Sequence, residues 1–256
     1  MINNKVFKIK KRQILKKPFD HLIIDNFLKT KTLLKIQKEF PKYNDKIWHE
    51  YSNYCENKKT CNQWNYFKPT VYSLFTFLNS EKFLVFLKQL FDQVVFADHG
   101  LHGGGLNIMK NGGNLNPHLD NNIHPKTFLK RKYNLILFTG DDFKKSWGGE
   151  LQLFHKNKFS NLKHGELFKS IVPKKNRVVI FDTSQDSWHA VNLINAKNKI
   201  FRRSIATYYF VSPKDIKNKR LKVLYSPTEK QKKNKTVLKF IKKRSNIKSF
   251  SNYYKV

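Results

Sequence analysis

Arg177-Val178-Val179-Ile180-Phe181 is one of several short β-type runs that decide the fold class of this chain. Similar runs lie at Tyr133–Phe138, Glu150–Phe154 and Ser204–Val211, and they are separated by stretches with Gly, Asn, Asp and Pro. Strands at such close spacing favour a β-barrel or β-sandwich over a parallel βαβ sheet. We therefore expect an all-β core with flanking helices, in which the core spans about residues 100–211.

The residues before this core predict helical support over about 18–99. Pro18–Leu28 contains a short apolar run with a turn after it, so we expect the fold to begin near Pro18. Apolar side chains then recur at helical spacing over Lys29–Phe40 and again over Ser80–Val95. These apolar stripes are expected to pack into the core rather than to carry chemistry.

The chain is predicted to have one folded domain over 18–211. A basic lead-in over 1–17 precedes it, and a basic tail over 212–256 follows it. Most of this tail is expected to be solvated, with one helix around Thr236–Lys243. We expect the loops around Cys55–Pro69 and 121–130 to determine which substrate the protein accepts.

The composition is strongly basic. The 256 residues include 51 Lys+Arg and 18 Asp+Glu, a formal net charge of +33, and 39% are hydrophobic, which is enough for a packed interior. Only seven of the basic residues are Arg, although a nucleic-acid surface more often uses Arg for bidentate contacts. We therefore expect non-specific binding to polyanions but no specific nucleic-acid binding.

The cysteines and the lengths of the apolar runs indicate where in the cell the protein is expected. Cys55 and Cys61 are too few for a disulfide framework, so both are predicted to be free thiols. Residues 1–17 contain no signal-peptide core, and no apolar run reaches the ~18 residues that a membrane span needs. We expect a cytoplasmic protein that does not cross a membrane.

A possible metal site is encoded in the β zone. His118 and Asp120 stand at positions i and i+2, which point to the same side of an extended segment. His189 follows the run Val178–Phe181 after a polar turn. Two His and one carboxylate are the facial triad of non-haem Fe(II) sites, which leaves three coordination positions open.

A second group of side chains could bind a dicarboxylic cosubstrate. Arg202 and Ser204 share one face of the run that follows His189. The guanidinium of Arg202 can form a bidentate fork with the far carboxylate, and Ser204 can add a hydroxyl hydrogen bond. Arg203, on the other face, is better explained as a surface residue.

With these motifs in this order, the sequence resembles the Fe(II)/2-oxoglutarate-dependent oxygenases of the prolyl 4-hydroxylase-like group. The resemblance covers roughly Pro18 to Ser212. The matching stretches are Phe19–Leu28, Gly103-Gly104-Gly105-Leu106, Gly112-Gly113-Asn114-Leu115, His118-Leu119-Asp120, Arg131–Leu135, Trp147–Leu151, Asn176–Phe181, Ser187-Trp188-His189 and Arg202–Tyr209. The resemblance implies a double-stranded β-helix, a jelly-roll of cupin type, with the iron at its mouth.

The resemblance also implies the roles of the site residues and the reaction. His118, Asp120 and His189 are implied to be the iron ligands, and Arg202 the partner of the far carboxylate of 2-oxoglutarate, with Ser204 assisting. The implied enzyme uses Fe(II), 2-oxoglutarate and O2, with ascorbate as an optional further cofactor. It hydroxylates an unactivated C–H bond and converts 2-oxoglutarate to succinate and CO2. The carboxylate of Asp120 favours hydroxylation over halogenation, because it fills the position that a halide would take.

One position departs from the family pattern. Members commonly carry a tyrosine on the strand after the His-x-Asp loop, and Phe138 stands there in this chain. The missing hydroxyl removes one hydrogen bond to the cosubstrate, worth ~1 kcal/mol, which Asn134 or an unidentified tyrosine could replace. His124 is expected to be an exposed loop histidine, with the substrate entrance as its alternative place.

The substrate stays open at this stage. A prolyl residue of a protein, a small molecule or a glycan intermediate would fit the resemblance. One alternative is a nucleic-acid-directed oxygenase that uses the basic surface, although Arg202–Phe210 lacks the further arginine that such enzymes carry. The other is a catalytically inactive basic binding protein. The sequence indicates neither the position of attack nor the oligomeric state.

Overall fold

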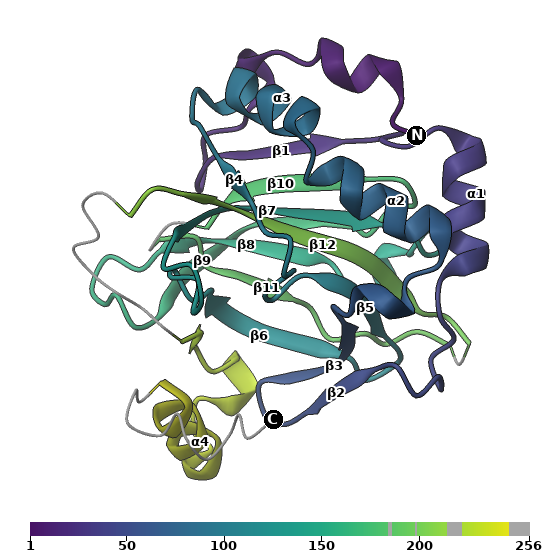
Figure 1. Cartoon of the computed structure of the whole chain (residues 1–256). Coiled ribbons are helices and arrows are strands. Elements are labelled where there is room, and N and C mark those ends of the chain that lie inside the picture. Colours follow the sequence, from purple (N-terminus) through teal and green to yellow (C-terminus); the bar gives the residue numbers. More distant parts are fainter. Residues whose placement is uncertain (184–185, 198, 214–221, 246–256) are drawn as a thin grey trace.

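The computed structural model describes residues 1–183, 186–197, 199–213 and 222–245. The described strands join into one mostly antiparallel sheet that curls into a jelly-roll, with the order β1-β10-β7-β12-β5-β3-β6-β11-β8-β9 (Figure 1). β13 is added beside β6, β2 beside β3 and β4 beside β12. The strands are β1 His21–Ile24, β2 His49–Ser52, β3 Glu56–Cys61, β4 Phe96–Ala97, β5 Gly105–Met109, β6 Asn114–Leu119, β7 Lys130–Phe138, β8 Leu151–Lys156, β9 His164–Ile171, β10 Val178–Asp182, β11 His189–Val191, β12 Arg202–Val211 and β13 Leu224–Tyr225. The expected all-β core is therefore confirmed.

The α-helices lie outside the curled sheet. They are α1 Thr30–Glu39, α2 Pro69–Leu78, α3 Glu81–Phe91 and α4 Lys235–Ser245. The first three cover one face of the sheet, on the side of β1, β10, β7 and β12 (Figure 1). Glu39 caps the start of α2, because its carboxylate accepts hydrogen bonds from the backbone N–H groups of Thr70 and Val71 at 2.8 and 3.1 Å.

Side-chain alternation gives the central strands two faces. On β7, Leu135 and Leu137 belong to the large apolar cluster under the helices, whereas Phe138 packs inside the jelly-roll against Leu151 and Leu153 of β8. Asn134 shares the inner face with Phe138, because it lies an even number of residues away. Because the inner face is buried and partly apolar, polar side chains on it are candidates for a functional role.

The beginning of the chain corrects one expectation. We expected a basic lead-in and a fold that starts near Pro18, but Ile2, Val6 and Ile14 are buried in the main apolar cluster. Ile2 also forms a β-bridge with Leu28. The apolar residues are scattered among lysines, which hid their pattern in the sequence. The first residues thus close one side of the helical layer.

The end of the chain also differs from expectation. The helix expected around Thr236–Lys243 is confirmed as α4, but the tail around it is not simply solvated. Val237 and Ile241 of α4 pack with Tyr225 and with Cys55. The parts of the tail at 214–221 and 246–256 lie outside the described residues. Residues 222–245 therefore form a small lobe on the jelly-roll, seen below β6 and β3 in Figure 1.

The region expected to be a substrate-determining loop, Cys55–Pro69, is mostly ordered structure. β3 occupies its first half and pairs with both β5 and β6, and a short 3-10 helix Trp64–Tyr66 follows. Its polar sequence, Glu-Asn-Lys-Lys-Thr-Cys, lacks the apolar alternation that marks a strand. Both cysteines are free, as predicted, and both are buried, which the polar sequence around them did not indicate.

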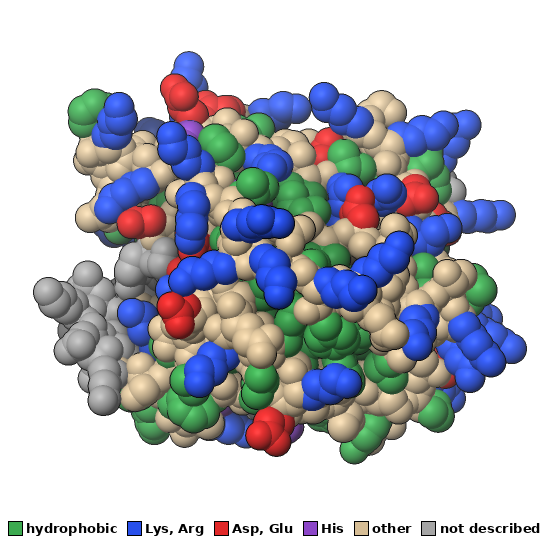
Figure 2. Space-filling model, turned by 90° about the horizontal axis from the view of Figure 1, so that it is seen from above, with side chains coloured by type: hydrophobic (Ala, Val, Ile, Leu, Met, Phe, Trp, Pro, Cys, Tyr) green, Lys and Arg blue, Asp and Glu red, His purple; other side chains and the backbone are tan. Residues whose placement is uncertain are grey.

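The surface carries the excess positive charge. Figure 2 shows lysine and arginine side chains spread over the whole face seen from above, with few acidic ones between them. They do not gather into one stripe or groove on that face, as they would on a nucleic-acid footprint. Among the described residues, no helix is both long and apolar enough to serve as a membrane span.

Candidate metal centre

Two neighbouring strands bring the expected metal ligands together. β6 and β11 pair antiparallel with His118 opposite His189, and Asp120 follows the end of β6. One ligand atom from each of these three residues lies within 4.8 Å of the others. All three side chains are buried, with 4% to 5% of each residue exposed. The two histidines and the aspartate thus face one point inside the jelly-roll.

Hydrogen bonds orient both imidazoles toward that point. Nδ1 of His118 lies 2.9 Å from the carbonyl oxygen of Asn116, and Nδ1 of His189 lies 2.9 Å from that of Ser187. An Nδ1–H that donates to a carbonyl leaves the Nε2 lone pair free for a metal. The Nε2 atoms of His118 and His189 lie 3.6 and 3.8 Å from the carboxylate oxygens of Asp120. This arrangement fits a divalent cation held by two nitrogens and one oxygen.

The protonation states also suit a metal. Burial, with a contribution from His189, lowers the pKa of His118 to about 3, so this imidazole is neutral at pH 7. Burial alone would raise the pKa of Asp120, but the neighbouring His189 and Arg131 outweigh this effect, so the pKa is lowered. The donor set therefore includes the neutral His118 imidazole and the Asp120 carboxylate, both of which Fe(II) accepts.

Tyr208 holds the aspartate in place. Its hydroxyl donates to Oδ2 of Asp120 at 3.2 Å, and the guanidinium of Arg131 lies 3.8 Å from the centre of its ring. Sequence reasoning did not single out this tyrosine. The available signal was its position on β12, six residues after Arg202, which places both side chains on the same face.

Arg202 lies at the start of β12, buried on the inner face. Its Nε donates to the carbonyl oxygen of Gly149 at 2.8 Å, and its guanidinium lies 4.9 Å from the ring centre of Phe138. Its Nη2 is buried and has no hydrogen-bond partner. Burial lowers the pKa of Arg202 to about 10, so the side chain still carries its charge at pH 7. A buried cation with an unused donor fits a carboxylate ligand.

Gly149 explains how Arg202 is anchored. Gly148 and Gly149 have φ angles of +69° and +75°, which glycine adopts readily. A Cβ atom at Gly148 would lie 1.9 Å from the carbonyl oxygen of Leu193. The paired glycines thus allow a turn that presents the Gly149 carbonyl to the arginine.

The other residues expected near the cosubstrate also lie on the inner face. Ser204 is buried, with 3% exposed, and pairs in register with Phe138. No hydroxyl stands at position 138, as the sequence implied. Asn134 is opposite Tyr208 on β12 and Phe181 on β10, and its Oδ1 is buried without a hydrogen-bond partner. These polar atoms line the same side of the sheet as Arg202.

His124 is not the exposed loop histidine that we expected. It is 5% exposed, and its Nε2 lies 3.5 Å from Oδ1 of Asp98. Its Nδ1 accepts hydrogen bonds from the backbone N–H groups of Lys126 and Thr127. The histidine therefore folds the loop after Asp120 into a compact turn. Its polar sequence gave no sign of this burial.

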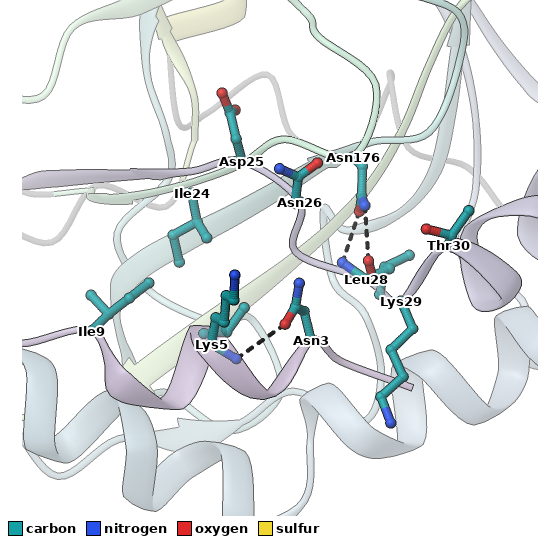
Figure 3. Close-up of a pocket in the computed structure, with 11 residues that line it drawn as sticks. Asn3, Lys5, Ile9, Ile24, Asp25, Asn26, Leu28, Lys29, Thr30 and Asn176 are labelled. Carbon is teal, nitrogen blue, oxygen red and sulfur yellow. Dashed lines mark hydrogen bonds between the residues drawn. The ribbon is translucent and has the colours of Figure 1, made fainter.

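A separate cavity of about 620 Å³ lies between the N-terminal segment and the turn after β1 (Figure 3). Asn3, Lys5 and Asn176 are among its lining residues. The side chain of Asn176 is already used, because it accepts from the backbone N–H of Leu28 at 2.8 Å and donates to its carbonyl at 2.9 Å. This cavity includes none of the metal-centre residues.

Comparison with known proteins agrees with this geometry. Residues 104–211 match the family model of the 2OG-Fe(II) oxygenase superfamily, and this range contains all three residues of the cluster. None of the curated proteins matches the chain.

The fold has relatives among solved structures. One is a prolyl-4-hydroxylase from Pseudomonas putida, with a TM-score of 0.51, 13% identity, and coverage of 74% of this chain and 91% of that one. Another is a prolyl hydroxylase from Trichoplax adhaerens in complex with a hypoxia inducible factor oxygen degradation domain peptide fragment. Its TM-score is 0.53 and its identity 16%, over 80% of this chain and 89% of that one. A structure of prolyl 4-hydroxylases from Phytophthora capsici has a TM-score of 0.50 and 19% identity, and the match covers 88% of this chain and 69% of that one.

At these identities the likeness establishes a shared fold, the double-stranded β-helix, and the family match covers the strands that hold the cluster. Residues 104–211 are thus similar, over the strands that carry the cluster, to the 2OG-Fe(II) oxygenase superfamily, whose enzymes use Fe(II), 2-oxoglutarate and O2.

Proposed function

We propose that this oxygenase is a hydroxylase in which His118, Asp120 and His189 hold Fe(II). Arg202 binds the far carboxylate of 2-oxoglutarate, with help from Ser204. The observation that carries this proposal is the buried Nη2 of Arg202, which has no partner and lies on the inner face of the jelly-roll. A buried arginine of this kind costs free energy unless a ligand pairs with it.

The bound iron with 2-oxoglutarate and O2 supplies the oxidising chemistry, in which one oxygen atom of O2 enters the substrate as a hydroxyl and the other enters succinate, with loss of CO2. The protein's own residues prepare the site. The carbonyls of Asn116 and Ser187 keep Nδ1 protonated on the two histidines, and Tyr208 fixes the carboxylate of Asp120. Burial of the cluster keeps bulk water away from it.

Asn134 takes the place of the missing tyrosine hydroxyl in this proposal. Its buried side chain lies on the same face as Arg202, where its Nδ2 can donate to the cosubstrate carboxylate. An amide that donates to a carboxylate contributes ~1 kcal/mol, similar to the hydroxyl that Phe138 lacks. The cosubstrate would then be held by one arginine, one serine and one asparagine.

The substrate class that we propose is a prolyl residue of a protein. Two structures of similar fold are prolyl hydroxylases, and one of them was solved with a peptide fragment bound. A small molecule or glycan intermediate is the alternative. The carboxylate of Asp120 favours hydroxylation over halogenation, as the sequence implied.

The experiment that tests the proposal is anaerobic addition of Fe(II) and 2-oxoglutarate to the apo-protein. Chelation of Fe(II) by 2-oxoglutarate produces a visible charge-transfer band, which should appear with the wild type and not with His189→Ala. No band from a folded wild-type protein would contradict the proposed site.

Substrate class needs a second measurement. Succinate formation should increase with a proline-containing peptide and not with the same peptide in which alanine replaces each proline. If both peptides increase succinate formation equally, or if neither increases it, the proposal of a prolyl substrate is wrong and the small-molecule or glycan alternative remains.

A further inference from the structure

The lobe formed by residues 222–245 lies against the strand that carries the first residue of the metal cluster (Figure 1). β13 pairs antiparallel with β6, with Leu224 opposite Leu119 and Tyr225 opposite His118. On its other edge β6 pairs with β11, where His189 is also opposite His118. The backbone at His118 is therefore enclosed between a strand of the jelly-roll and a strand of the lobe. The lobe itself lies outside the family match, which ends at residue 211.

The lobe contacts the His118 imidazole directly. The ring of Tyr225 lies 5.7 Å from the imidazole, measured between ring centres, with 33° between the ring planes. Tyr225 is 3% exposed, so this contact is buried. The hydroxyl of Tyr225 makes a hydrogen bond with Glu56 of β3, which fixes the ring from its far end. An aromatic ring held at both ends limits the ring orientations that His118 can adopt.

Hydrogen bonds from the lobe hold the residues just before His118. The backbone N–H of Ser226 donates to the carbonyl of Pro117 at 2.7 Å. The side chain of Asn116 donates to Oε1 of Gln231 at 2.6 Å, while its backbone carbonyl accepts the Nδ1 proton of His118. The carbonyl that sets the His118 tautomer thus belongs to a residue that the lobe holds by its side chain.

The lobe is attached firmly enough to act in this way. Arg244 forms an ion pair with Glu56 at 2.8 Å, and the Glu56 side chain is only 3% exposed. The side-chain amide of Gln231 donates to the carbonyl of Tyr54 at 2.7 Å. Val237 and Ile241 bury their side chains against Cys55. These contacts all end on β3 and the residues just before it, next to β6.

We infer that Tyr225 is a positioning residue for the metal centre, acting through His118, and that the lobe over 222–245 is one wall of that centre. The inference rests on the proposed function, because it assumes that His118 is a metal ligand. Residues that orient a ligand from outside the coordination sphere affect metal affinity about 10- to 100-fold. Loss of the Tyr225 ring should therefore weaken metal binding without unfolding the jelly-roll.

Three variants separate positioning from general support. Tyr225→Leu removes the ring, whereas Tyr225→Phe keeps the ring and removes only the hydroxyl. Phe240→Leu is the matched control, because Phe240 belongs to the same lobe but packs on Tyr54, with 5.5 Å between ring centres, instead of on His118. Mn(II) alone is titrated into each apo-protein by calorimetry, and the thermal unfolding midpoint is measured beside it.

Tyr225→Leu should bind Mn(II) at least ~10-fold more weakly, Tyr225→Phe should lose less affinity because it keeps the ring, and Phe240→Leu should bind as the wild type does. The inference fails if Tyr225→Leu binds as tightly as the wild type, or if Phe240→Leu weakens binding by the same factor. A wild-type protein that binds no Mn(II) would instead remove the metal site itself, and with it the proposed function.

Discussion

Replacement of Arg202 by lysine tests the cosubstrate site most directly. The guanidinium now uses Nε to bind the Gly149 carbonyl at 2.8 Å and leaves Nη2 without a partner. Lysine keeps the charge but offers one point donor in place of the planar fork. At least one charge-assisted hydrogen bond to the carboxylate is therefore lost, which is worth ~1.5–3 kcal/mol. Since ~1.4 kcal/mol changes a dissociation constant tenfold, 2-oxoglutarate should bind about 10- to 150-fold more weakly.

The assay is titration of 2-oxoglutarate into the anaerobic Fe(II) protein, read from the charge-transfer band, with succinate kinetics as a second measurement. The KM for 2-oxoglutarate should rise much more than kcat falls. Arg203→Lys is the matched control, since the guanidinium of Arg203 lies over the rings of Phe40 and Phe201 at 5.7 and 5.8 Å. If Arg202→Lys keeps the wild-type affinity, or if both variants lose it equally, the assignment of Arg202 is wrong.

Three further predictions follow from the site and the lobe. His118→Ala and Asp120→Ala should each abolish succinate formation while the thermal midpoint stays near that of the wild type, because the cluster sits on a preformed sheet; a variant that unfolds would contradict this. Tyr208→Phe removes the hydrogen bond to Asp120 and should weaken Mn(II) binding ~10-fold, whereas Tyr209→Phe, whose hydroxyl bonds to the carbonyl of Leu78 on the other face, should not. Burial alone would raise the pKa of Glu56, but the positive charges of Lys58 and Arg244 lower it from 4.5 to about 2. The ionised Glu56 therefore stabilises the fold above pH 4.5, and this stabilisation is lost as the pH falls toward 2. Denaturant unfolding at pH 5 and pH 3 should show a loss from this pair of about 2 kcal/mol that is absent in Glu56→Gln, and identical losses in both proteins would count against the Glu56–Arg244 pair.

The sequence was most informative where chemistry and strand pattern coincide. The runs at Tyr133–Phe138 and Ser204–Val211 are strands β7 and β12, as expected from their β-branched and aromatic residues. The i, i+2 spacing of His118 and Asp120 does direct both side chains to one point, because the segment is extended. Short-range rules of this kind need no knowledge of distant partners.

Long-range pairing explains what the sequence did not reveal. β3 is a polar strand, and its pairing with β5 and β6 uses backbone groups that leave no side-chain pattern. Tyr225 comes to His118 from more than a hundred positions along the chain, with no motif between them. Val237 and Ile241 are four residues apart, which is helical spacing, but two apolar residues among lysines did not indicate what they pack against.

The pairing of β13 with β6 also orders events during synthesis. The ribosome releases His118 and His189 well before Tyr225, Gln231 and Arg244, so the jelly-roll strands are complete while the lobe is still missing. Domains fold in this vectorial order as they emerge. Until β13 pairs, the end of β6 at His118 and Leu119 therefore has a strand on only one edge, that of β11. The enclosure of His118 is therefore completed by a segment that follows all of the jelly-roll strands in the chain.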